Sequence, residues 1–449
     1  MFTCKFPTYR PRPNMAAAST QLIKNKQVDR STLEGILGMF WNAEVTVSDV
    51  QLEPATSRGN NFISDAWRIK FEHTKKRRPQ TVCTVRVEGD AYARKYTTIR
   101  RDGIRKSIFV KSRPEDEEHN ALMHTDIAFK NEILAYEKVL MALDVYSNGP
   151  LRVPTYVYGN PTTVILEDMA NKYFECMNRK YVISWNQVWS PIREMAKLHA
   201  ASIVMKKLNK PYFEEMIKQI TQVPLSETIK LAEKQASTID TTIELLRVRN
   251  EPNAQEYIET LKELKEKAWN KQREIINKEA PVMVVNHGNF WINNLLYRND
   301  LSMLLDWQHI VYSSPATDLC FFLYVNFATA FLTNQREALL SYYLMHLHQS
   351  IYDVCTERQM NISDIDGLLE PLTYEWIDSE LKRCSLCGYM MAQWINPIFY
   401  WSEAVFDMME KVGGMENMSV EQRLENMTSE QKDRVIQLTK VFMNEYREN

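Results

Sequence analysis

The chain contains 449 residues, of which 45% are hydrophobic and 25% are charged, and its net charge is −2. This length is about two to three times that of a usual domain. Because the charge is nearly balanced and basic residues are not interleaved with aromatic ones, the composition gives no support for binding nucleic acid or another polyanion. It predicts a globular protein of two lobes with a sizeable core.

No segment of the sequence has the pattern of a secretory signal or a membrane span. Residues 1–19 include basic residues but no apolar core of secretory length. The most apolar stretch, Leu319–Leu332, is interrupted by Asn326 and is shorter than the roughly 20 residues that a spanning helix needs. We therefore expect a cytoplasmic monomer.

The seven cysteines are scattered and odd in number, which argues against a disulfide framework and suits a reducing compartment. Cys384 and Cys387 form the only close pair. A zinc site would need a second pair or a histidine cluster nearby in the sequence, and the chain has neither. We expect both cysteines to be ordinary helix-face residues, not metal ligands or a redox pair.

Strand patterns dominate the first part of the chain. Alternating β-branched and aromatic residues predict strands at Phe62–Phe71, Thr81–Val87 and Ser107–Val110. Between the first two strands, the basic run Lys75–Pro79 indicates the solvated tip of a hairpin, although a nuclear-localisation signal has the same composition.

Helical spacing takes over after a solvated acidic run at Glu115–Glu118. Apolar residues between Ile127 and Leu140 predict a helix. Two strands are predicted next, at Arg152–Tyr158 and Thr163–Leu166, and then a helix at Trp185–Lys206.

A pair of amphipathic helices follows. Apolar residues alternate at spacings of three and four from Leu225 to Leu246, and the pattern resumes from Tyr257 to Ala268. Pro252 breaks the two apart, which predicts a hairpin of helices packed on each other. A coiled coil is the alternative for such a pattern.

Three short apolar runs separated by polar turns come next, at Val282–Val285, Leu295–Tyr297 and Leu301–Leu305. The order predicts a strand, a polar loop and a hairpin that ends at an acidic residue. The amide of Asn294 and the carboxylate of Asp306 flank this hairpin. Both are hard oxygen ligands, and they could share one Mg²⁺.

Together these elements predict an α+β fold of two lobes. We expect an extension at residues 1–43 with a short helix from Thr32, followed by an N-terminal lobe of antiparallel strands plus one helix at 44–168. A larger, mostly helical C-terminal lobe with a helical-hairpin insertion is expected at 169–449.

The order of candidate polar residues matches the needs of phosphoryl transfer, which are cations around the triphosphate, a metal held by oxygen atoms, and a group that orients the attacking hydroxyl. Lys111 ends a predicted strand, Glu132 lies on the next predicted helix, and His287 opens the loop before the hairpin.

On these residues the sequence resembles the ecdysteroid kinase-like (CHK kinase-like) family of insects, which is related to aminoglycoside and choline kinases. The resemblance runs from about Gln51 to about Phe406. The family's His-Gly-Asp-x-Trp-x-Asn-Asn, Asp-Phe-Gln and Ser-Pro-x-x-Asp-Leu motifs are similar to His287–Asn294, Asp306–Gln308 and Ser314–Leu319. Upstream, the similar segments are Val110–Pro114, Phe129–Tyr136, Leu166–Met169, Leu198–Ser202 and, with a single glycine, Gly59–Phe62.

The resemblance implies a two-lobed protein-kinase-like fold, ATP and Mg²⁺ as cofactors, and a role for each matched residue. In the C-terminal part, Asn294 and Asp306 would hold Mg²⁺, His287 would hold the loop backbone, and Asp318 would tie down the loop by hydrogen bonds. In the N-terminal part, the residues expected around ATP are Asn61 in a covering turn, Lys111 on the phosphates, Glu132 as partner of that lysine, and Glu167 and Met169 at the hinge that meets the adenine.

The sequence departs from the family at Asn289, where the family has an aspartate that accepts a hydrogen bond from the substrate hydroxyl and can take its proton. Asparagine keeps the size and one acceptor oxygen but cannot act as a base near neutral pH. General-base catalysis typically contributes on the order of 10²–10⁴-fold, whereas much of kinase catalysis is positioning and electrostatics. Asp300 and Asp318 stay open as substitutes for the missing base.

Two hypotheses follow. The first is an ATP-dependent small-molecule kinase in which Asn289 orients a hydroxyl of an ecdysteroid or another lipophilic alcohol, foreign compounds included. The second is a pseudokinase that binds nucleotide, and a small ligand, with little catalysis. The stretch Gly388–Trp401, rich in methionine and aromatic residues, could line an apolar pocket for a steroid, or it could be a buried helix of the C-terminal lobe.

Overall fold

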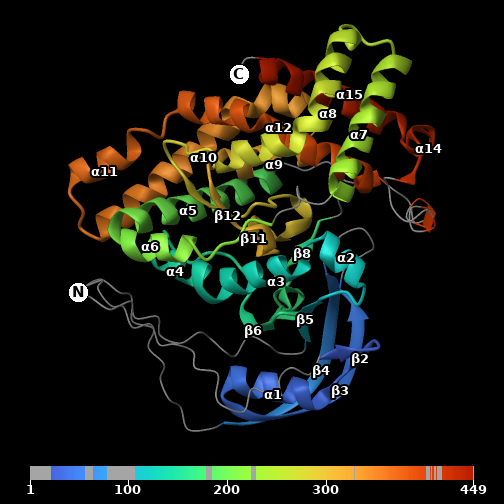
Figure 1. Ribbon diagram of the computed structural model, residues 1–449. Helices are drawn as coiled ribbons and strands as arrows, with labels where there is room; N and C mark the ends of the chain where they lie inside the picture. Colours follow the sequence, from blue (N-terminus) through green and yellow to red (C-terminus); the bar gives the residue numbers. More distant parts are fainter. Residues whose placement is uncertain are drawn as a thin grey trace.

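A five-stranded antiparallel sheet forms the N-terminal lobe in the computed structural model. The structure describes residues 22–55, 64–77, 107–177, 185–223, 229–327, 329–400, 405, 407–408, 411 and 417–447. A larger helical lobe lies on one side of this sheet (Figure 1), so the predicted two-lobed α+β fold is confirmed. In spatial order, the strands are β3 (Ala43–Pro54), β4 (Asp65–Arg77), β5 (Ser107–Ser112), β7 (Thr163–Glu167) and β6 (Tyr156–Asn160).

Alternating apolar residues give this sheet a buried face. Ile69 and Phe71 of β4 belong to the same core cluster as Ile108 and Val110 of β5. Helix α1 (Arg30–Trp41) packs into this cluster, and its buried residues are Leu33, Ile36, Leu37 and Trp41. A two-stranded ribbon, β1 (Ile23–Lys24) and β2 (Gln27–Val28), precedes it.

One expectation for this lobe is wrong and another lies outside the described residues. The basic run Lys75–Pro79 was predicted to be a hairpin tip, but its first three residues belong to a strand. Lys75, Lys76 and Arg77 continue β4 and pair with the start of β3. Long side chains on a solvated strand edge and on a turn give the same local composition, so the sequence could not separate them. The predicted strand Thr81–Val87 falls outside the described residues.

The helix predicted between Ile127 and Leu140 is present and is longer than expected. It consists of α3 (Thr125–Leu134), the π-helical turn η2 (Ala135–Val139) and α4 (Leu140–Val145), and the short helix α2 (Glu117–Leu122) precedes it. Figure 1 shows α2 and α3 between the sheet and the helical lobe. Elements at this boundary can carry side chains that contact both lobes.

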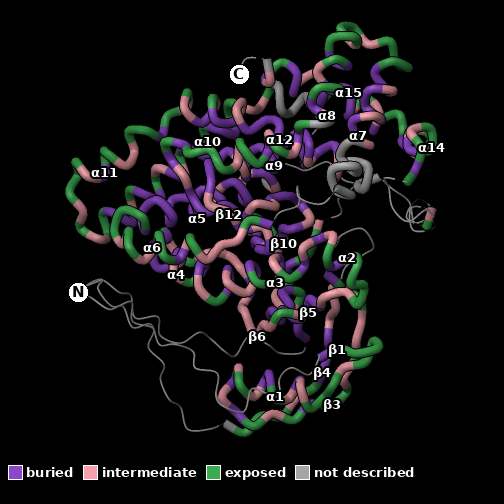
Figure 2. Tube along the Cα trace, viewed as in Figure 1, coloured by how far each residue is buried: buried purple, intermediate pink, exposed green. Residues whose placement is uncertain are grey.

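The helical lobe is built around α5 (Trp185–Leu208), which is mostly buried (Figure 2). The predicted helical hairpin is formed by α7 (Ile229–Val248) and α8 (Ala254–Asn277). Among the described helices, none combines the length and apolar character that crossing a bilayer requires. The other helices are α6 (Lys210–Ile217), α9 (Ala316–Asn326), α10 (Thr329–Glu357), α11 (Ile362–Leu369), α12 (Tyr374–Tyr400), α14 (Val420–Glu425) and α15 (Ser429–Arg447).

Short strands within the helical lobe carry the polar loops. Strand β9 (Val284–Asn286) pairs with β12 (Val311–Ser313). The predicted hairpin is β10 (Leu295–Arg298) and β11 (Leu301–Leu304), with β8 (Glu175–Cys176) on its other edge. Its turn has Asn299 at a positive φ of 54°, which asparagine tolerates better than most residues.

Helix α9 is held in place by close packing on α12. A Cβ at Gly388 of α12 would lie 2.8 Å from the backbone oxygen of Cys320 and 2.8 Å from Cδ2 of Tyr324, both on α9. Glycine therefore allows the two helices to approach each other at this point. Cys384 and Cys387 lie on the same helix, both buried.

We predict that Gly388→Ala lowers the free energy of unfolding by about 1–3 kcal/mol, because the added methyl group overpacks the α9–α12 contact. Gly367→Ala is the matched control, since that glycine lies in α11 with no heavy atom within 4 Å of an added Cβ. It should gain up to about 1 kcal/mol from helix propensity. Urea unfolding of the two variants measures both values, and equal effects would contradict the packing argument.

Candidate active site

Lys111 lies in a buried charge cluster that joins the two lobes. It is on β5, where it pairs with Ala66 and Val164 of the neighbouring strands, and only 4% of its surface is exposed. Its Nζ lies 2.6 Å from Oε2 of Glu132 on α3. The same Nζ forms an ion pair with Oδ1 of Asp306, just after β11. The structure thus brings together three of the residues that the sequence singled out.

The electrostatics of this cluster favour a further cation. Burial disfavours the charged form of Lys111, but Asp306 and Glu132 outweigh it and raise its pKa above the ordinary value. Burial raises the pKa of Glu132 to about 7, against the opposing effect of Lys111. One ammonium group therefore faces two carboxylates in a region of low exposure, an arrangement that a divalent cation can complete.

Asn294 and Asp306 fit the oxygen ligands of a Mg²⁺ ion. The Asn294 Nδ2 donates to the backbone oxygen of Asn289 at 2.9 Å, an orientation that leaves its Oδ1 as the ligand atom. The backbone N–H of Leu305 donates to the Asn294 carbonyl at 2.9 Å, which joins the two flanks of the hairpin. Asp306 has φ 66° and ψ 68°, a strained left-handed conformation that is typical of functional positions.

A two-residue site is consistent with magnesium chemistry. Within the described ranges, no group of three or more His, Cys, Asp and Glu side chains could hold a metal ion. Mg²⁺ is usually bound by one or two protein ligands together with substrate phosphates and water. Asn294 and Asp306 would therefore need a phosphate-bearing partner such as ATP.

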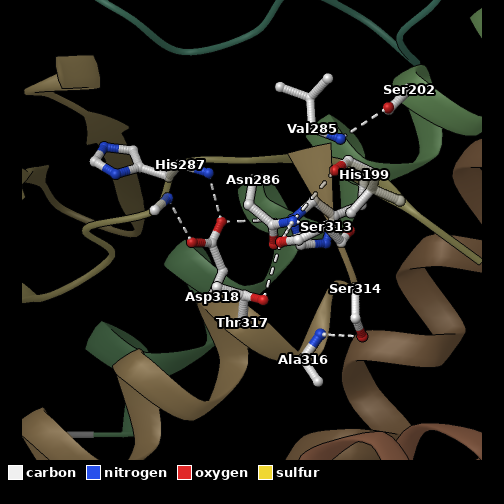
Figure 3. A network of polar contacts seen from close by, with 12 residues as sticks. His199, Ser202, Val285, Asn286, His287, Ser313, Ser314, Ala316, Thr317 and Asp318 are labelled. Atoms are coloured by element: carbon white, nitrogen blue, oxygen red, sulfur yellow. Dashed lines mark hydrogen bonds and ion pairs between the residues drawn. The ribbon is translucent and has the colours of Figure 1, made fainter. Parts of the chain in front are cut away.

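The loop that carries Asn289 is fixed by Asp318, in the first turn of α9 (Figure 3). One oxygen of this fully buried carboxylate accepts the N–H of His287 at 2.7 Å, and the other accepts the N–H of Gly288 at 2.8 Å. Burial lowers the pKa of His287, although Asp318 opposes this shift. The neutral ring donates from Nε2 to the carbonyl of Leu305 at 2.6 Å, and its Nδ1 accepts the N–H of Asn289 at 3.3 Å.

A second layer of hydrogen bonds supports this loop from α5, α10 and β12. His199 of α5 bonds through Nδ1 to the hydroxyl of Tyr343 at 2.9 Å, and its Nε2 lies 3.6 Å from Asp318. The Ser202 hydroxyl accepts the N–H of Val285 at 2.9 Å (Figure 3). Asn286 binds both the carbonyl and the hydroxyl of Ser313. His199 and Ser202 both belong to Leu198–Ser202, one of the segments that resemble the family.

Sequence reasoning missed the role of Asn326. Its Oδ1 accepts the N–H of Ile292 at 2.9 Å and so fixes the far end of the loop that precedes the hairpin. The signal was present, because Asn326 is the polar residue that interrupts the most apolar stretch of the chain. A polar residue in such a run is costly to bury unless it has a hydrogen-bond partner.

Asn289 is half-buried, and its carboxamide makes no hydrogen bond to any residue that the structure describes. Neither acid that the sequence left open can take over as base in this geometry. Asp300 is exposed at the hairpin turn, and both oxygens of Asp318 are used by backbone N–H groups. The side chain at position 289 is therefore the group that remains available to a substrate hydroxyl.

The residues expected at the hinge, Glu167 and Met169, lie at and just beyond the other end of β7 from the lysine. Lys111 pairs with Val164, and Glu167 is three residues further along, about 10 Å away at strand spacing. The Glu167 carboxylate accepts from Thr155 and Lys172 through Oε2, and its backbone N–H donates to the Thr155 carbonyl at 2.8 Å, so Glu167 is held in place by its neighbours. Met169 is buried with Phe174 and Met303. Asn61 and the turn around it lie outside the described residues.

The sheet lobe, the lysine paired with a helix glutamate, and the loop and hairpin of the helical lobe define a kinase-like fold. The chain belongs to the ecdysteroid kinase-like family, whose sequence profile matches residues 58–356. Membership supports a small-molecule kinase as the class of activity. A comparison with curated proteins gives no match.

Solved structures similar to this chain include a choline kinase, an ethanolamine kinase and an amicoumacin kinase. Choline kinase from Cryptosporidium parvum matches with a TM-score of 0.40 and 10% identity, over 89% of this chain and 94% of that one. An ethanolamine kinase from Plasmodium vivax gives 0.38 and 12%, over 88% and 83%. The amicoumacin kinase hAmiN, in complex with AMP-PNP, Ca²⁺ and Ami, gives 0.36 and 10%, over 88% and 89%.

We predict that Gly288→Ala destabilises the protein far more than Gly149→Ala. Both glycines have a positive φ, 77° and 80°, so an alanine pays about 1–2 kcal/mol of backbone strain at either position. Only at Gly288 would the added Cβ also meet a backbone atom, the oxygen of His309, at 1.9 Å. The extra loss should be about 1–3 kcal/mol or more in urea unfolding. Similar losses for the two variants would show that the loop does not depend on this approach.

We also predict that the neutral state of His287 makes stability depend on pH. The unfolded histidine has a pKa near 6.5 and the folded one a lower pKa, so the unfolded state binds more protons below that pH. The free energy of unfolding should then fall as pH drops below about 6.5, by at most about 1.4 kcal/mol per pH unit for this group. His287→Gln should show a shallower fall between pH 6.5 and 5 in denaturant titrations. Parallel curves for the two proteins would contradict the prediction.

Proposed function

We propose that this chain is an ATP-dependent small-molecule kinase that transfers a phosphoryl group to a hydroxyl of an ecdysteroid or another lipophilic alcohol. The observation that carries the proposal is the buried Lys111, held between Glu132 and Asp306. The family name supports the kinase reaction and points to ecdysteroids as acceptors.

Each residue of the cluster has a task that follows from its charge. Lys111 is cationic and pre-positioned by Glu132, so it can neutralise phosphate oxygens of ATP. Asp306 and Asn294 would hold Mg²⁺, which when bound supplies positive charge for the phosphates. The backbone of residues 167–169 would receive the adenine, about 10 Å from Lys111 along the strand.

Asn289 would orient the acceptor. Its Oδ1 can accept a hydrogen bond from the attacking hydroxyl and so fix the direction of attack. The acceptor oxygen forms a bond to the γ-phosphorus while the bond to the ADP oxygen breaks. Because the transition state of phosphoryl transfer is loose, the nucleophile needs little prior deprotonation. The hydroxyl proton passes to the transferred phosphoryl group and from there to solvent.

The second candidate is a nucleotide-binding pseudokinase, and the same Asn289 favours it. Without a base, the reaction loses a contribution on the order of 10²–10⁴-fold. Lys111, Asp306 and Asn294 would still bind Mg²⁺–ATP, so binding of nucleotide cannot separate the two candidates. Phosphoryl transfer can.

We predict that the wild-type chain transfers labelled phosphate from ATP to at least one member of a panel of ecdysteroids and lipophilic alcohols. Asn289→Ala should lower the rate at least about tenfold, because the acceptor loses its hydrogen bond. Asn289→Asp should raise it, by up to the 10²–10⁴-fold range of general-base catalysis. The measurement is product formation under saturating Mg²⁺–ATP.

Asp306→Asn serves as the inactive control, since it removes a charge from the metal-binding pair. Calorimetry with Mg²⁺–ATP shows whether each variant still binds nucleotide. A wild type no faster than Asp306→Asn, together with an active Asn289→Asp, would establish the pseudokinase. Failure of the wild type to bind Mg²⁺–ATP at all would rule out both candidates.

A further inference from the structure

The two lobes meet at a second place, away from the charge cluster. Met123 and Ala128, on either side of the start of α3, are buried in one small apolar cluster. Trp269 of α8 and Trp394 of α12 pack against it. We call this group the α2–α3 junction. It combines a flexible methionine side chain with two indole rings, a combination that adapts well to an apolar ligand.

Polar atoms around the α2–α3 junction are buried without partners. Oγ1 of Thr125, Oδ1 of Asn120, Nε2 of His124 and Nε1 of Trp269 have no hydrogen-bond partner in the described part of the chain. Thr125 is 0% exposed and Asn120 only 1%. Buried polar atoms are nearly always paired in folded proteins, so unpartnered atoms on Trp269 and on three residues close to Met123 in the chain indicate that something else completes them.

The chemistry of these atoms selects the kind of molecule. The indole N–H is a donor only, the Asn120 oxygen an acceptor only, and the threonine hydroxyl is both. Hydroxyl groups of a ligand can serve all three. An ammonium group would stack well on the indoles but offers no acceptor to Trp269. The exposed acidic run Glu115–Glu118, just before Asn120, disfavours an anion.

The α2–α3 junction is also within reach of the loop that carries Asn289. Thr125 and Glu132 are seven residues apart on α3, about 10 Å along the helix axis. Asn131, next to Glu132, donates to the backbone oxygen of Gln308 at 3.3 Å. The following residue, His309, lies directly against Gly288. A molecule of several rings could therefore occupy the α2–α3 junction and present one hydroxyl near Asn289.

We propose that the α2–α3 junction binds the apolar body of the phosphoryl acceptor, a neutral molecule with several hydroxyl groups, with Trp269 and Thr125 as hydrogen-bond partners. This inference rests on the proposed function for the identity of the ligand as acceptor. It goes beyond that function by assigning the specificity for a neutral polyol to residues outside the loop and the metal-binding pair.

The test uses methyl cholate as probe, because it is neutral, apolar in its ring system and carries three hydroxyls. Its tri-O-methyl ether and choline are the comparison probes. Wild type, Thr125→Val and Trp269→Phe are titrated by calorimetry in the full-length protein. Thr125→Val keeps the shape of the side chain and removes the hydroxyl, whereas Trp269→Phe keeps an aromatic ring and removes the indole N–H. Each should weaken methyl cholate binding about five- to tenfold, the usual effect of one neutral hydrogen bond.

Trp376→Phe is the matched control. Trp376 also has an unpartnered Nε1 among the described residues, but it is 18 residues from Trp394 on α12, about 27 Å away. It should leave methyl cholate binding unchanged. Hydrogen exchange should show protection by the probe in peptides that cover residues 117–134 and 260–275. Unchanged melting temperatures confirm that the variants are folded.

Several outcomes would overturn the inference. One is that methyl cholate does not bind to the wild type. Another is that the tri-O-methyl ether or choline binds as tightly as methyl cholate. A third is that Trp376→Phe weakens methyl cholate binding as much as the two junction variants do. Its failure is distinct from that of the proposed function. Phosphoryl transfer with unaltered probe binding in the variants refutes the site alone, whereas selective probe binding without any transfer refutes the kinase alone.

Discussion

The ion pairs of Lys111 are the contact on which the site depends. A buried ammonium or carboxylate is costly alone, and removing one partner of such a pair leaves an uncompensated charge. Here the lysine comes from the sheet, Glu132 from the helix beside it and Asp306 from the hairpin of the other lobe. Each charge can be buried only if all three elements are in place, so the cluster fixes the sheet relative to the hairpin and places two carboxylates where a cation is needed.

Two acidic residues of the helical lobe, Asp318 and Asp306, differ in what their carboxylates contact. Asp318 is fully buried and uses both oxygens on backbone N–H groups, so its charge holds the loop. Asp306 is partly exposed and carries the strained backbone, and its second oxygen receives only a long contact of 3.3 Å from Gln308. A carboxylate with spare lone pairs can bind a metal ion, whereas a saturated one cannot. The geometry therefore distinguishes an acid that holds backbone, Asp318, from one with oxygen lone pairs left for the proposed metal ion, Asp306, although both lie in matched motifs.

Local pattern was sufficient for the parts of this protein that are built from neighbours in sequence. The hairpin from Leu295 to Leu304 follows from two apolar runs and a two-residue turn, and the loop before it follows from polar residues after a buried strand. Contacts between distant segments left weaker signals. Nothing local to Trp269 or Met123 indicates that they meet, and the approach of His309 to Gly288 depends on a three-residue helical turn after Asp306. The lysine-rich end of β4 has the same composition as a turn, so the sequence alone could not identify it as strand.

In the proposed kinase, Asn289 would change the balance between nucleotide binding and phosphoryl transfer more than the shape of the site. An aspartate there would place a third negative side chain close to the triphosphate, beside Asp306 and Glu132. Asparagine removes one unit of repulsion, which favours binding of the anionic nucleotide. The same exchange withholds a base from the acceptor hydroxyl, and a loose transition state tolerates this loss only if the acceptor is already well aligned. If the proposed kinase is correct, its rate must come from acceptor binding, so the contacts that hold the body of the acceptor would matter more here than in a relative with the aspartate.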